Sequence, residues 1–463
     1  MLPGRLEFFM SQPNETRRLE TDPIGKLLLA YSCPAIVSMV IVSLYNIFSS
    51  IFIGHGVGAL AITGLAVTFP FMNLVLAVCM LVAIGGATVC SIELGAGNPE
   101  RAAQVLGHNV VLSLVFAVAF AAVSLIFLDP ILRLFGASDD TIGYARDYMR
   151  IILWGAPIGN LMLAFSHFLR ASGYPTKSMA ISLCSVGSNI ALTPLFIFVF
   201  DMGIKGAGYA TVLSQLFALV PLILHFRNPE SAVHFKPGIF RLRRAVVKSI
   251  LSIGLSPFLM NVCGCLIIMV INVSLYRHGG DLAIGAYGIA NRLLMLFAMT
   301  IMGLTQGMQP IIGYNYGAKR LDRVQRTLKL GIIAGTAVTS CGFLAGQFFP
   351  ATLARLFTDH PDLIAMAANG LRLCTAMFFL VGSQIIIAGY FQSMGRASIA
   401  IFLSLSRQLL FLLPGLLFLP DYFGLDGVWI SLPIADAVAS LISIRILWRS
   451  YRSTPMGKAL KRK

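Results

Sequence analysis

Charged residues are scarce in this sequence. Asp, Glu, Lys and Arg make up 12% of its 463 residues, whereas soluble domains carry about 25%. Apolar residues make up 57%, and the mean hydropathy is +0.82. No soluble fold of this length has enough interior to hide so much apolar surface. The shortage of charge therefore excludes a soluble protein and predicts an integral membrane protein in contact with lipid.

Several signatures of catalysis and secretion are also missing. The sequence has no G-x-x-x-x-G-K-[ST] phosphate loop and no H-E-x-x-H zinc motif, so we expect no enzyme activity. Its eight cysteines all lie in apolar stretches, where they pack as small apolar side chains, and we expect no disulfide, metal site or cofactor. The first 22 residues lack the apolar core of a cleavable signal, so we expect the N-terminus to remain in the cytoplasm.

The excess of basic residues follows membrane topology. The formal net charge is +16, and Lys and Arg gather at residues 227–248, 319–329 and 449–463, between apolar runs. Such clusters mark the cytoplasmic side of a membrane protein. The loops that would then lie outside hold ten Asp and only five Arg or Lys residues. We therefore predict that both termini are cytoplasmic, and we expect no nucleic-acid partner.

Twelve apolar runs are long enough to cross a bilayer. A helix needs about 20 mainly apolar residues to span the hydrocarbon core. The runs centre near residues 40, 73, 116, 157, 189, 216, 266, 297, 336, 379, 412 and 436. Prolines interrupt several of them, as is common in transporter helices that bend near a binding site.

The two halves of the sequence repeat at a shift of 222 residues. The matching positions are 94–96 with 316–318, 60–62 with 282–284, Arg101 with Arg323, Arg150 with Arg372, and Gly173 with Gly395. Each half holds six predicted helices, an even number, so both halves enter the membrane from the same side. The predicted fold is an all-α integral membrane protein whose twelve transmembrane helices form two six-helix lobes related by a parallel internal repeat. The lobes are residues 1–226 and 246–463, the latter with a basic cytoplasmic tail, and residues 227–245 form a cytoplasmic linker.

Motifs spread over nearly the whole chain are typical of one transporter family. They include Phe52-Ile53-Gly54, Leu94-Gly95-Ala96-Gly97-Asn98, Leu169-Arg170-Ala171-Ser172-Gly173, Gly307-Met308-Gln309-Pro310 and Phe391-Gln392-Ser393-Met394-Gly395. With these motifs the sequence resembles the MATE (multidrug and toxic compound extrusion) family, in its bacterial MepA-type branch. The resemblance implies an antiporter of the bacterial cytoplasmic (inner) membrane that exports small drug-like, often cationic compounds in exchange for H+ or Na+. We expect it to be monomeric.

The sequence departs from the family pattern in its N-terminal half. The first helix of this branch commonly carries an Asp five residues before the glycine that Gly54 matches, and Ser49 stands there. The fifth helix commonly reads Asn-x-x-Leu-Asp-Pro, and Thr193 replaces that Asp. Hydroxyls can offer a lone pair to Na+ but cannot titrate near neutral pH. The resemblance therefore does not imply a proton or cation site in the N-terminal half of this chain.

One carboxylate is predicted near the middle of the membrane in the C-terminal half. Charged groups at this depth cost about 2.5 to 3.5 kcal/mol on insertion scales. Asp436 lies midway along the last predicted helix, and Arg407 lies within roughly one helical turn of the same depth on the antiparallel helix before it. We predict that they pair. The pair is either a neutralised structural contact or an ion-coupling site.

Five further polar residues are candidates for the substrate cavity, namely Asn46, Asn189, Asn272, Arg292 and Gln306. Buried amides serve equally well to join helices, and a long arginine side chain can instead reach the membrane surface. The main alternative function is a lipid-linked precursor flippase of the related superfamily. Such a protein would favour several basic residues in its cavity, whereas only Arg292 and Arg407 are deep candidates. A channel or receptor is disfavoured by the two-lobe repeat.

Overall fold

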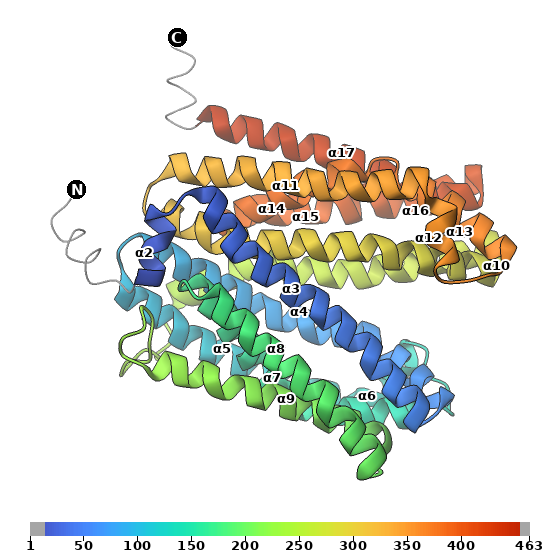
Figure 1. Ribbon diagram of the computed structural model, residues 1–463, viewed down its shortest axis with the longest axis horizontal. Helices are drawn as coiled ribbons and strands as arrows, with labels where there is room; N and C mark the ends of the chain where they lie inside the picture. The colour runs from blue at the N-terminus through green and yellow to red at the C-terminus, as the bar shows by residue number, and fades with distance from the viewer. Residues whose placement is uncertain (1–13, 454–463) are drawn as a thin grey trace. The chain divides into compact units, whose positions relative to one another are not determined.

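The computed structural model describes residues 14–453, and the side chains of residues 14, 15, 43–47, 50, 59 and 453 stay outside that description. Within this range the chain is helical and contains no β-strand (Figure 1). The helices before the loop at residues 228–243 are α2 (Asn14–Thr21), α3 (Ile24–Gly56), α4 (Ala59–Gly95), α5 (Pro99–Ile126), α6 (Leu128–Leu134), α7 (Ile142–Ala171), α8 (Pro175–Pro194), η1 (Leu195–Val199) and α9 (Gly203–Arg227). Those after it are α10 (Arg244–Gly317), α11 (Leu321–Phe348), α12 (Pro350–Arg355), α13 (Pro361–Thr375), α14 (Phe378–Ser393), α15 (Ala397–Leu405), η2 (Ser406–Leu412), α16 (Leu413–Phe423) and α17 (Leu425–Ser453). Both chain ends, predicted to be cytoplasmic, lie outside the described residues.

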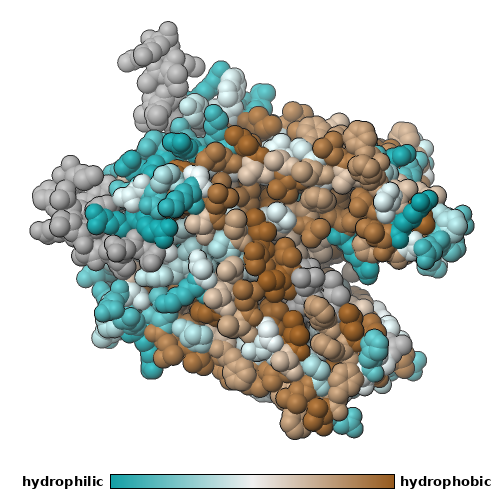
Figure 2. Space-filling view, viewed as in Figure 1, coloured by the Kyte–Doolittle hydropathy of each residue, from teal (hydrophilic) through white to brown (hydrophobic). Residues whose placement is uncertain are grey.

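The helices of the described range account for twelve membrane spans. Ten stretches of helix are long and apolar enough to cross a membrane, and α13 and α14, bent by 51°, form one more. The 74-residue α10 is interrupted by the backbone of Gly280 (φ 65°, ψ −162°). At 1.5 Å per residue it would extend about 110 Å, so α10 holds two spans. Apolar side chains cover the middle of the helices, and hydrophilic ones gather at their ends (Figure 2). The predicted all-helical membrane fold is confirmed.

Glycines with positive φ separate successive helices at repeat-related positions. Gly58 (φ 114°) stands between α3 and α4, and Gly280 (φ 65°) divides α10. These residues are 222 apart, which is the shift of the sequence repeat. Side chains are strained at such φ values, whereas glycine is not. Gly173 and Gly395, a pair predicted from the repeat, also both have positive φ. The repeat therefore extends from sequence to backbone conformation.

By its contacts the chain forms two compact units. The first comprises Met1–Val262, Gln306–Val324 and Ser393–Gly395, and the second comprises Cys263–Thr305, Gln325–Gln392 and Arg396–Lys463. A buried core in the first unit includes Phe71, Tyr148 and Met149. A core in the second unit is built around Trp429 and Tyr287. The lobes predicted from the repeat, with their linker at residues 227–245, stay a prediction.

Within the first unit, two repeat-related glycines let α4 and α10 approach backbone to backbone. A Cβ atom at Gly95 would overlap the carbonyl oxygen of Tyr314, and one at Gly317 would overlap that of Ile92. Ile92 and Tyr314 are themselves 222 residues apart, so the contact is reciprocal. Membrane helices associate through close packing at small residues. Glycine at both positions therefore sets how closely these helices can cross.

Two π-helical segments occur next to prolines. Segment η1 directly follows Pro194, and η2 ends two residues before Pro414. Proline lacks an N–H group and cannot bond the carbonyl four residues earlier. Local rewinding of the helix satisfies the carbonyls that are freed in this way. Single π turns inside α-helices are frequent at functional sites, and η2 carries Arg407.

Candidate functional site

The last two spans bring Arg407 and Asp436 together within the second unit. Arg407 Nε on η2 donates a hydrogen bond to Asp436 Oδ1 on α17 over 2.5 Å. The Asp436 side chain is 4% exposed and the Arg407 side chain 27%. Asp436 is the only acidic residue classed as buried between residues 14 and 453. A buried carboxylate needs such a counter-ion, because taking an unpaired charge out of water is costly.

The two elements that carry this pair also carry buried polar atoms without hydrogen-bond partners. Trp429 Nε1 and Gln408 Oε1 are both buried and unpaired within the part of the chain that the structure describes. Trp429 lies seven residues before Asp436 on α17, and hence on the same helix face. The Tyr287 ring lies 6.1 Å from the Trp429 ring. Unpaired buried polar groups are rare in stable interiors, so their presence on the same two elements as the ion pair favours a functional site.

The first unit has a neutral polar network where the family pattern has a carboxylate. Thr193 Oγ1 donates to Asn189 Oδ1 (2.9 Å) within α8. Asn189 Nδ2 then donates to Thr211 Oγ1 and to Ser214 Oγ on α9, each over 3.3 Å. Ser185 Oγ completes the link by donating to the Ser214 carbonyl (3.2 Å). All five residues are buried. The amide of Asn189 is therefore occupied in joining α8 to α9, and its role in a substrate cavity stays a prediction.

The remaining candidates are not brought together by any described hydrogen bond. Ser49 on α3 and Asn272 on α10 are half-buried, and Arg292 is exposed. Gln306 is 9% exposed, and its Oε1 is buried without a partner among the described residues. The side chain of Asn46 lies outside the described part of the structure. Of these, Gln306 is the one whose unsatisfied acceptor favours contact with a ligand.

Sequence reasoning missed the members of the network on α9, Thr211 and Ser214. A signal was available, because Ser185, Asn189 and Thr193 follow one another at four-residue spacing and so share one face of α8. The 222-residue shift also places Ser185 opposite Arg407. The charged pair of the second unit thus corresponds to an uncharged hydroxyl network in the first.

The helices and the buried pair define a class of protein. Many helical membrane spans, two repeat-related halves of the sequence and a buried ion pair are features of a secondary transporter. Within residues 14–453 no group of three or more His, Cys, Asp or Glu could hold a metal ion. The model of the MatE family matches residues 34–195 and 254–417. The chain belongs to this family of multidrug and toxic compound extrusion transporters, whose members are antiporters that use ion gradients.

Similar proteins support the same assignment along nearly the full length. Multidrug export protein MepA of Staphylococcus haemolyticus is 28% identical over 440 residues, which cover 95% of this chain and 97% of that protein. The solved structure of the MATE multidrug transporter DinF-BH, in complex with a ligand, is 35% identical, with a TM-score of 0.87 over 95% of this chain and 99% of that one. An outward-facing MATE transporter of the MOP superfamily shares the fold at 24% identity, with a TM-score of 0.88 over 95% of this chain and 98% of that one. The resemblance predicted from the motifs is confirmed.

Proposed function

We propose that this chain is a proton-coupled multidrug exporter of the bacterial cytoplasmic membrane, monomeric and with both termini in the cytoplasm. It moves drug-like, often cationic compounds outward in exchange for H+ taken up at Asp436. The class of efflux antiporter follows from family membership. The coupling ion, the role of Asp436, the quaternary state and the orientation are the proposed part.

The buried pair of Arg407 and Asp436 carries this proposal. The ionised carboxylate holds the guanidinium over 2.5 Å. Protonation of Asp436 removes the charge that holds Arg407, and the π-helical η2 can then rewind against α17. A single proton is in this way linked to a movement between the last two spans. Charge inside the membrane is costly unless it is paired, so the two states of this pair differ strongly in energy.

The donor set favours H+ over Na+. A sodium site needs several oxygen ligands with free lone pairs, and Asp436 is the only buried acidic residue that the structure describes. The Arg407 guanidinium already occupies its Oδ1, and a second cation there would be repelled. In the first unit, Asn189 Oδ1 accepts the Thr193 hydroxyl, so that oxygen is also in use.

The same observations favour an exporter of cations over a lipid-linked precursor flippase. An anionic headgroup would need free basic residues in the cavity. Of the two deep candidates, Arg407 is engaged by Asp436, which leaves Arg292 alone where several basic residues would be needed. A weakly basic interior is compatible with organic cations, and the related DinF-BH transporter was solved with a drug-like ligand bound.

Transport by the full chain in proteoliposomes tests this proposal, with ethidium, a fluorescent organic cation, as the probe. We expect ethidium movement under an imposed pH gradient, none under a Na+ gradient alone, and loss of the pH-driven movement in Asp436→Asn. Asp426→Asn is the matched control on the same helix. Asp426 lies exposed in the first turn of α17, where its Oδ1 accepts a hydrogen bond from Asn369 Nδ2 (2.9 Å). Transport driven by Na+ alone, or pH-driven transport by Asp436→Asn at the control rate, would contradict the proposal.

A further inference from the structure

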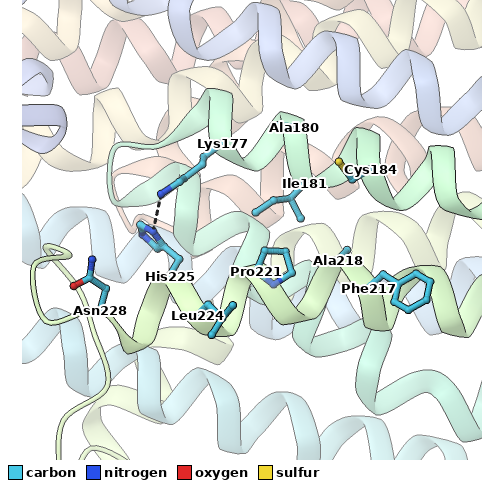
Figure 3. A pocket seen from close by; sticks show the side chains of 10 residues that line it. All are labelled: Lys177, Ala180, Ile181, Cys184, Phe217, Ala218, Pro221, Leu224, His225 and Asn228. Atoms are coloured by element: carbon cyan, nitrogen blue, oxygen red, sulfur yellow. Dashed lines mark hydrogen bonds between the residues drawn. The ribbon is translucent and has the colours of Figure 1, made fainter.

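A groove of about 500 Å³ runs between α8 and α9 in the first unit, and none of the residues discussed above lines it. Its walls are mainly apolar and include Ile181 on α8 and Phe217, Pro221 and Leu224 on α9 (Figure 3). Phe217 and Leu224 are 51% and 60% exposed. Exposed apolar side chains on a membrane span are suited to contact with lipid. The walls of the groove are therefore suited to the acyl chains of the bilayer.

One end of the groove is polar and carries hydrogen-bond donors. Lys177 Nζ lies 3.5 Å from His225 Nδ1 (Figure 3). An ammonium group can only donate, so Nδ1 accepts and the ring proton resides on Nε2. His225 Nε2 is buried and has no hydrogen-bond partner among residues 14–453. Because His225 Nε2 is buried, the donor that the groove presents to an anion is the lysine ammonium, which has further N–H groups besides the one directed at His225.

No acidic side chain competes for this position. The ion pairs found in the described chain do not include Lys177. The ammonium group also lies 5.5 Å from the centre of the Tyr174 ring, a cation–π contact that holds it near His225. Positive charge without a carboxylate nearby repels a cationic drug and attracts an anion.

The position of Lys177 and His225 along the helices matches that of a lipid headgroup. Lys177 lies in the first turn of α8 and His225 in the last turn of α9, so both are at the end of their spans. The apolar walls extend from there toward the middle of the membrane. Basic pockets between spans on the cytoplasmic side are suited to anionic lipid headgroups, and the basic residues 227–248 directly follow α9.

We propose that this groove binds one anionic phospholipid, which belongs to the inner leaflet in the orientation proposed above. Its phosphate accepts hydrogen bonds from Lys177, which His225 holds in place, and one acyl chain lies along Ile181 and Phe217. A free phosphate ion would leave the apolar walls unused. A zwitterionic lipid would bring its ammonium group to a site that offers no carboxylate.

Native mass spectrometry of the full chain in an uncharged detergent tests the site. Phosphatidylglycerol and phosphatidylcholine with identical acyl chains are titrated separately, and we expect one phosphatidylglycerol to bind at least about tenfold more tightly, as for a charge-assisted contact. Lys177→Gln should weaken that binding about tenfold, and Leu224→Asp should abolish it by adding a carboxylate to the wall. Arg396→Gln is the matched control. Arg396 directly precedes α15, the helix that corresponds to α8 in the repeat, and its Nη1 already donates a hydrogen bond to Ser450 Oγ (3.0 Å).

Three results would overturn the proposal. The first is equal binding of the two lipids. The second is unchanged phosphatidylglycerol binding in Lys177→Gln relative to Arg396→Gln, with both variants eluting as the wild type does. The third is displacement of the lipid by millimolar inorganic phosphate, which would assign the Lys177 ammonium to a free anion.

Discussion

Single and double substitutions of Arg407 and Asp436 separate proton coupling from packing. Asp436→Asn keeps the size of the side chain but leaves a guanidinium without its counter-ion. Breaking a buried pair in this way costs about 3–5 kcal/mol. Because the Arg407 side chain is 27% exposed, solvent screens part of its charge and the cost should fall near the lower bound, about 3 kcal/mol. We therefore expect Asp436→Asn to insert in the membrane but to unfold at lower temperature.

The double variant Asp436→Leu/Arg407→Met should recover that stability. Replacing a buried ion pair by apolar residues of similar volume is often neutral or stabilising by about 1–4 kcal/mol. If the carboxylate is the proton site, the double variant stays inactive although it is stable. If the pair only joins η2 to α17, stability and export return together.

Two measurements on each variant decide between these outcomes. Thermal unfolding in detergent reports the packing, and ethidium export driven by a pH gradient in proteoliposomes reports the coupling. Asp426→Asn again serves as the control, since it should change neither. Export at the wild-type rate by the stable double variant would refute the coupling role of Asp436.

Three further predictions concern other parts of the chain. Thr193→Val leaves Asn189 Oδ1 without its donor, so we expect a loss of about 1–3 kcal/mol in thermal unfolding with transport retained; abolished transport in this folded variant would show that the neutral network is essential for coupling. Ser49→Ala lies outside that network and should cause a smaller loss, again with transport retained; abolished transport in this folded variant would show that the Ser49 hydroxyl itself is essential. Gly95→Ala should destabilise the protein by about 1–3 kcal/mol, because the added Cβ would overlap the Tyr314 carbonyl. The control Gly187→Ala, which has open space around it, should be neutral or slightly stabilising. Equal unfolding temperatures for the two variants would contradict the close crossing of α4 and α10. Arg146 donates two hydrogen bonds to Asp129 (2.7 and 2.6 Å) and lowers the pKa of that carboxyl, so its stabilising contribution is present at neutral pH and is lost as the pH falls through the lowered pKa. Asp129→Asn should thus cost less than about 1 kcal/mol at pH 7, and the difference in unfolding temperature should vanish in strong acid; a difference that grows on acidification would show that the sign is wrong.

The membrane spans and the Arg407–Asp436 contact could be predicted because strong physical constraints act on them. Apolar runs of about 20 residues have no other stable place than the bilayer, and a charge at that depth needs a counter-ion. Asp436 and Arg407 are the deepest opposite charges on neighbouring antiparallel helices. Sequence alone therefore identified the partners, although it did not indicate that η2 is π-helical. Whether the pair couples transport to protons stays a prediction.

Other features depend on tertiary context and left no clear signal. Arg101 and Arg323 match in the repeat, yet Arg101 lies 3.8 Å from Glu93, whereas Arg323 donates to the carbonyls of Leu19 and Asp22 (3.2 and 2.6 Å). The short helix α2, which ends beside Arg323, has no counterpart in the second half. Likewise, the bend between α13 and α14 falls at Ala376 and Met377, without the proline or glycine that usually marks a break.

The reciprocal crossing of α4 and α10 at Gly95 and Gly317 bears on how such a chain originates. Gly95 contacts Tyr314, and their repeat equivalents, Gly317 and Ile92, contact each other in the same way. Such a reciprocal contact is called isologous. It is the contact that two identical subunits make across a twofold axis. A six-helix subunit with Ile92 and Gly95 on its surface would meet a second copy of itself in this way. The glycine crossing therefore has, within a single chain, the reciprocity of a homodimer interface.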